Sequence, residues 1–156
     1  MNPNSPQFQQ AIRLIQSTPG YVEIGVALAQ MASENRIRVD GNLEDRAQAG
    51  LLGTITLGPE AVESSALSLA QTLVHEHFHL RQNPLQKTVS FWSGVLSQSP
   101  VMKRYEQPAY QAGIDFLEAV KRKHPHLTDE ADNEQAEIRQ IFELDFGGIL
   151  DRIPKM

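Results

Sequence analysis

The segment from Gly58 to Pro84 constrains the fold most, because it predicts a long helix with two chemically different faces. Pro59 suits the first turn of a helix and Pro84 ends one, so we expect a helix that starts there or at Ser64 and ends near Gln82. At about 100° per residue, apolar side chains gather on one face, namely Ala66, Ala70, Leu73, Val74 and Leu80, with Leu67, Leu69 and Phe78 on its flanks. This face is expected to pack against the core.

The opposite face carries a pattern typical of a metal site. Ser68 and Thr72 lead to His75 and His79, and Glu76 lies at the edge, so that residues 75 to 79 satisfy the pattern H-E-x-x-H. Residues four apart lie one above the other on a helix, and both imidazoles can therefore reach one tetrahedral ion. Glu76 is rotated by about 100°, which places it beside the ion, where it can take a proton from water and pass it to a leaving amine.

Two plainer interpretations of these histidines stay open. His75 and His79 could be a solvated pair on a helix surface, or they could bind a structural metal without catalysis. His77 lies at the centre of the apolar face and points away from the expected ion. We predict that His77 is a buried, hydrogen-bonded core histidine and not a ligand.

The composition limits which ligands and partners are available. The chain has 156 residues, enough for one domain spanning residues 1–156, with 40% hydrophobic and 21% charged residues. It contains no cysteine, so a metal must be held by His and carboxylate side chains. The net charge of −5 argues against nucleic acid or an anionic membrane as a partner. Without an apolar run of about 20 residues or a secretion signal, we expect a cytoplasmic protein whose oligomeric state is open.

A catalytic zinc site normally has three protein ligands and a water molecule, so a third ligand is needed. We favour Glu106, which lies near the start of the next long helix, after a gap that lets the chain return to His79. Tyr110 falls one turn later on the same face. The alternatives for the third ligand are Asp115, Glu118, His124 and His126.

The rest of the chain predicts a small sheet among helices, an α+β fold dominated by helices. Helices are expected over Gln7 to Gln16, Val22 to Glu34, Pro100 to Lys123 (with Pro108 starting or kinking it) and Thr128 to about Phe146. Strands are expected over Arg36 to Val39 and Leu51 to Leu57, and Leu85 to Ser99 is a helix or loop that carries Trp92.

The motif at residues 74 to 79, followed by a helix with Glu106-Gln107-Pro108-Ala109-Tyr110, resembles the gluzincin branch of the zincin metallopeptidases, in particular its minimal single-domain members. The resemblance implies a zincin-like domain that binds Zn²⁺ through His75, His79 and Glu106, with Glu76 as general base and a peptide or protein as substrate. It also implies that the strand before the active-site helix, Gly53 to Leu57, forms the rim of the cleft and pairs with an extended peptide.

Hydrolysis also needs a group that stabilises the oxyanion of the tetrahedral intermediate. Tyr110 is the first candidate, followed by Tyr105, and then by Tyr21 and Arg81. The expected activity is that of a zinc metallopeptidase. The alternative is a non-catalytic, metal-stabilised binding or regulatory module on the same scaffold.

Overall fold

The computed structural model describes residues 5–50, 53–82 and 100–146, which form mostly helices and one three-stranded sheet. This agrees with the expected α+β class. The elements in chain order are α1 (Pro6–Gln16), α2 (Val22–Ser33), β1 (Ile37–Val39), β2 (Ala47–Ala49), β3 (Ile55–Leu57), α3 (Pro59–Val62), α4 (Ala66–Leu80), α6 (Pro100–Lys123), a 3₁₀ turn η1 (Pro125–Leu127) and α7 (Thr128–Phe146).

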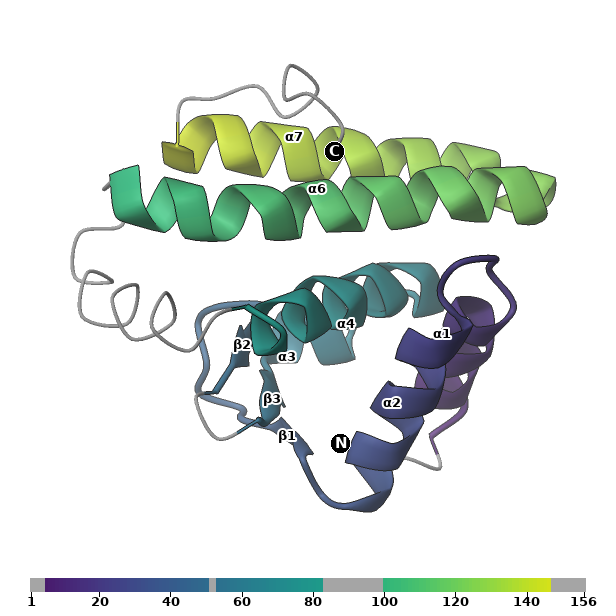
Figure 1. The fold of residues 1–156 in the computed structure, drawn as a ribbon, viewed down its shortest axis with the longest axis horizontal. Coiled ribbons are helices and arrows are strands. Elements are labelled where there is room, and N and C mark those ends of the chain that lie inside the picture. The colour runs from purple at the N-terminus through teal and green to yellow at the C-terminus, as the bar shows by residue number, and fades with distance from the viewer. Residues whose placement is uncertain (1–4, 51–52, 83–99, 147–156) are drawn as a thin grey trace.

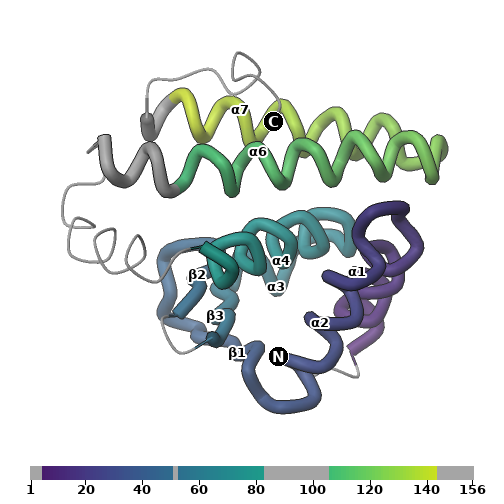
Figure 2. The backbone as a smooth tube through the Cα atoms, viewed as in Figure 1, coloured from purple at the N-terminus to yellow at the C-terminus, as the bar shows by residue number. Residues whose placement is uncertain are grey.

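Helix α4 lies in the middle of the molecule. Helices α1 and α2 and the sheet lie on one side of it, and α6 and then α7 lie on the other (Figure 1). The same order of elements can be followed in the backbone trace of Figure 2. The core is continuous around α4 and includes the fully buried side chains Ile15, Leu28, Leu57, Leu69, Leu73, Phe116 and Phe142. The apolar face of α4 thus packs as its sequence predicts.

The two N-terminal helices form close to their predicted bounds. The Ser5 hydroxyl accepts a hydrogen bond from the amide of Phe8 and so caps the start of α1, while Phe8 is buried in the core. Gly25 weakens the helix prediction, yet α2 runs through it. A Cβ at Gly25 would collide with Gln16, so the glycine lets α1 and α2 approach closely.

The sheet contains one strand, β2, that was not predicted. β3 is central, parallel to β1 and antiparallel to β2. The expectation that Gly53 to Leu57 forms the exposed rim of a cleft is therefore wrong, because β3 is paired on both sides. β2 was not expected, since alanine and glutamine have little intrinsic preference for strands. Of the predicted strand over Leu51 to Leu57, only Ile55–Leu57 is a strand among the described residues.

The segment before the metal motif forms two helices. The first, α3, ends at Val62, where the Ser64 hydroxyl donates to the carbonyl of Ala61 at 2.6 Å. Ser65 then caps α4 by accepting from the amide of Ser68 at 3.1 Å. The single long helix that the sequence predicts is therefore two helices, one that starts at Pro59 and one that starts at Ala66, two residues after the alternative start at Ser64.

Helix α6 crosses α4 closely enough for their polar side chains to meet. A Cβ at Gly113 would come within 3.0 Å of the Gln71 side chain of α4, so glycine keeps this crossing close. Pro108 lies inside α6 and does not start it. Segment 85–99, with Trp92, lies outside the described residues, and among the described residues no helix has the length and apolar content needed to cross a membrane.

Candidate metal centre

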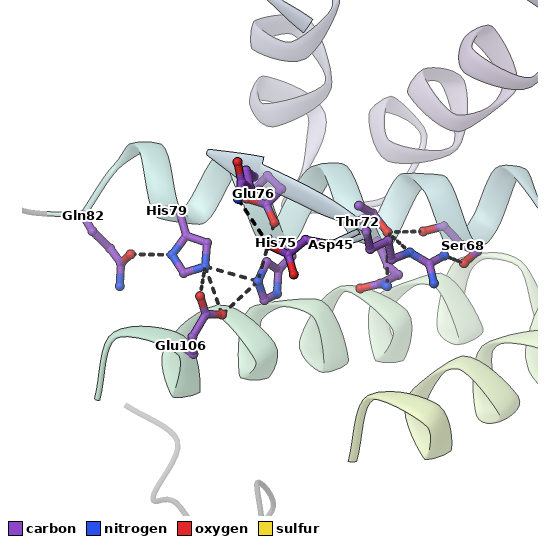
Figure 3. Close-up of polar contacts among 11 residues, drawn as sticks. Asp45, Ser68, Thr72, His75, Glu76, His79, Gln82 and Glu106 are labelled. Carbon is purple, nitrogen blue, oxygen red and sulfur yellow. Dashed lines mark hydrogen bonds and ion pairs between the residues drawn. The ribbon is translucent and has the colours of Figure 1, made fainter. Parts of the chain in front are cut away.

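Helices α4 and α6 bring His75, His79 and Glu106 together (Figure 3). The two Nε2 atoms are 3.2 Å apart. Glu106 Oε1 lies 3.1 Å from His79 Nε2, and Glu106 Oε2 lies 3.3 Å from His75 Nε2. His79 is buried, and the side chains of His75 and Glu106 keep 14% and 19% of their surface exposed. Three donor atoms thus converge at a site that solvent still reaches.

These separations suit a zinc ion. Tetrahedral bonds of about 2.0–2.1 Å place ligand atoms about 3.3 Å apart, close to the distances among these three side chains. Two imidazoles and a carboxylate leave a fourth position for water or substrate, as in catalytic zinc sites. The donor set therefore fits zinc in spacing and in chemistry.

Gln82 orients one of the imidazoles. His79 Nδ1 donates a hydrogen bond to Gln82 Oε1 at 2.6 Å, so His79 Nε2 is the nitrogen that faces His75 and Glu106. Such a bond fixes the tautomer and the ring orientation of a metal-binding histidine. The sequence prediction missed Gln82, which lies three residues after His79, just beyond the end of α4.

Glu106 and His79 shift each other's pKa in opposite directions. Burial by itself raises the pKa of Glu106, but hydrogen bonds from His75 and His79 lower it to about 2. Burial lowers the pKa of His79, but the hydrogen bond and the charge of Glu106 outweigh it and raise this pKa above its usual value. Glu106 and His79 thus stabilise each other's charged form.

Glu76 lies beside the three donors without joining them. Its Oε1 is 3.9 Å from His75 Nε2, and the residue is only 6% exposed. Burial raises the pKa of Glu76, and the charges of His75 and His79 oppose this rise, whereas Glu106 and Asp45 add to it. Asp45 lies near Glu76 in Figure 3 and was not expected from the sequence. A buried carboxylate with a raised pKa is suited to accept and return a proton.

No model of a known protein family matches the chain, and comparisons with curated proteins and with solved structures found no match either. The resemblance to gluzincins stays a prediction.

The alternative third ligands lie elsewhere. Asp115 accepts a hydrogen bond from Gln111, and Glu118 pairs with Lys121 at 2.7 Å. His124 Nε2 lies 3.0 Å from the hydroxyl of Ser17, and the rings of His124 and His126 are 6.0 Å apart. Among the described residues, only Glu106 joins the histidine pair in a group of three donors.

Of the candidates for oxyanion stabilisation, Tyr110 contacts one of the ligands. Its ring is 4.8 Å from the His75 ring in an edge-on contact and 5.6 Å from Phe142. Tyr21 packs instead against Phe116 at 5.1 Å. The Tyr105 side chain lies outside the described part of the chain, and Arg81 lines a cavity with His77, described below.

Arg46, the residue before β2, connects this strand to the polar face of α4 through hydrogen bonds. Its Nε donates to the Thr72 hydroxyl at 2.7 Å, another guanidinium nitrogen donates to the Ser68 hydroxyl, and a third lies 3.5 Å from Glu60. A Cβ at Gly58 would collide with the backbone just before Arg46, so glycine keeps this corner close. The serine and threonine that lead to the metal motif therefore position the neighbouring strand.

His77 is buried, as predicted, with 9% of its surface exposed. Burial lowers its pKa, and the charge of Arg81 lowers it further, so the neutral ring is favoured. The predicted hydrogen bond is absent, since His77 makes none to the described residues.

Proposed function

We propose that the chain is a zinc-dependent peptidase of the gluzincin type. The observation that carries the proposal is the convergence of His75, His79 and Glu106, with Glu76 buried beside them. Zn²⁺, when bound, would polarise the substrate carbonyl and make a water molecule more acidic. The remaining chemistry falls to side chains of this protein.

Glu76 is the general base in this proposal. Its carboxylate is held 3.9 Å from His75 Nε2, so it reaches the same space as the three donors. It accepts a proton from the attacking water at a carboxylate oxygen and then gives that proton to the leaving nitrogen. The raised pKa of Glu76, caused first by its burial, makes the protonated form accessible for the second step.

Tyr110 is the proposed donor to the oxyanion. It stands one turn after Glu106 on α6, and its ring touches that of His75. A phenol hydroxyl at this place can donate a hydrogen bond to the negative oxygen that develops during hydrolysis.

The peptide is proposed to bind along β2 rather than along β3. Gly50 donates to the Thr54 carbonyl at 2.7 Å, and Gly58 donates to the Arg46 carbonyl at 2.8 Å. Because such bonds recur at every second residue, the backbone groups of Ala47 and Ala49 point away from β3. β2 is an edge strand of the described sheet and packs against α4, so an extended peptide added there would run beside the metal donors.

Replacing Glu76 by Gln tests this function, because the amide keeps the shape and cannot take the proton. Zinc-loaded wild type, Glu76→Gln and the control Glu143→Gln, which changes an exposed carboxylate on α7, would be incubated with a peptide library and analysed by mass spectrometry. We expect equal zinc content in all three proteins and a loss of cleavage of about 100-fold to 10,000-fold in Glu76→Gln alone.

Unchanged cleavage by Glu76→Gln would refute the mechanism. Zinc bound at one ion per chain, with no cleavage of any peptide by the wild type, would instead favour the metal-stabilised module.

A further inference from the structure

A second pair of polar side chains lies on the face of α4 that is turned away from the metal donors. His77 is about 200° around the helix from His75, and Arg81 follows one turn later. Both line a cavity of about 520 Å³. Its other wall is the start of α2, with Gly20, Val22, Glu23, Ile24 and Ala27.

The donors in this cavity lack an acceptor. His77 is nine-tenths buried, lines the cavity and makes no hydrogen bond to the described residues. Arg81 is exposed to solvent, forms no ion pair with a described carboxylate, and lies close enough to act on His77 through its charge. Buried polar groups in proteins are nearly always hydrogen-bonded, so the buried His77 is open to a partner from outside the chain, and the exposed Arg81 places a positive charge beside it.

The wall of the cavity that α2 forms favours an anion with an apolar part. Tyr21, at the N-cap, provides no side-chain hydrogen bond to the first turn of α2, whose partial positive charge attracts anions. Val22 and Ile24 give this wall an apolar surface. The volume lies within the range of about 300–1,000 Å³ that is usual for small-molecule sites.

We propose that this cavity binds a small organic acid. Its carboxylate or phosphate group accepts hydrogen bonds from Arg81 and His77, and its apolar body packs on Val22 and Ile24. Glu23 lines the same cavity and repels the anion, so it limits the affinity. The site needs no metal and does not depend on the proposed peptidase activity.

Calorimetric titration of the zinc-loaded chain with hexanoate, hexyl phosphate and inorganic phosphate tests this proposal. We expect saturable binding of one hexanoate or one hexyl phosphate per chain, with the stronger of the two identifying the head group. Inorganic phosphate should bind more weakly because it lacks the apolar body. Arg81→Gln should weaken binding about ten-fold or more, whereas Glu23→Gln should strengthen it.

The control Arg13→Gln removes an exposed arginine from α1 and should leave the affinity unchanged. The His77 ring signals in a nuclear magnetic resonance spectrum should shift during the titration. Absence of saturable binding, or equal binding by wild type and Arg81→Gln, would overturn the proposal. Binding that is lost when the zinc is removed and is unchanged in Arg81→Gln would place the anion at the zinc. This result too would overturn the proposal.

Discussion

In the metal-free protein, the carboxylate between two imidazoles should make stability depend on pH in a distinctive way. The pKa of Glu106 is about 2 in the folded chain against an ordinary 4.5, so its contribution is fully present above 4.5 and is lost as pH falls toward 2. The pKa of His79 is raised above 6.5, so its contribution is fully present below 6.5 and is lost as pH rises through the raised value. Both contributions are complete only between these limits, at mildly acidic pH.

The magnitude follows from the pKa difference of Glu106. A fall from 4.5 to about 2 corresponds to about 3 kcal/mol of folding free energy, of which about 2 kcal/mol disappears between about pH 5.5 and about pH 3. Glu106→Gln carries no charge and should lack this component. Urea unfolding of both proteins after removal of metal, at a series of pH values, measures the difference. Parallel loss of stability by the two proteins over this range would show that Glu106 is not the source of this pH dependence.

Three further outcomes are expected. Gln82→Leu removes the acceptor that orients His79 and should weaken zinc binding about 10-fold to 100-fold, whereas Gln82→Glu should keep it near the wild-type value; competition with a chromophoric chelator measures both. Arg46→Ala leaves two hydroxyl groups of α4 without their donor and should lower the free energy of unfolding by about 1–3 kcal/mol in urea, while the exposed change Arg13→Ala should alter it little. Phe116→Ala empties a fully buried position and should cost about 3–5 kcal/mol in the same assay, and a cost below 1 kcal/mol would contradict the described core.

The helices were predictable because their signals are local. Turn residues and a 3.6-residue spacing mark the bounds of α1, α2, α4 and α7, and the i, i+4 spacing of His75 and His79 fixes their common direction. The prediction of Glu106 depended on α6 returning across α4, which requires only that the two helices pack. Periodicity within each helix was therefore enough to propose the donor set.

The parts that could not be predicted depend on contacts between distant segments. Ala47–Ala49 becomes a strand only because β3 lies beside it, and nothing in these residues favours a strand. β3 is the central strand because β1 and β2 pair with its two edges, and no local pattern in the sequence encodes that pairing. Arg46 and Asp45 reach the face of α4 through that sheet, so their proximity to the site had no sequence signal.

The most direct test of the metal centre is the zinc content per chain of wild type and Glu106→Ala, each purified without added metal and measured again after zinc is offered. We expect close to one zinc per wild-type chain and clearly less in the variant, with Glu143→Gln matching the wild type. Full zinc in Glu106→Ala would show that the third ligand lies elsewhere. A wild-type chain that takes up no zinc even when it is offered would contradict the proposed centre altogether.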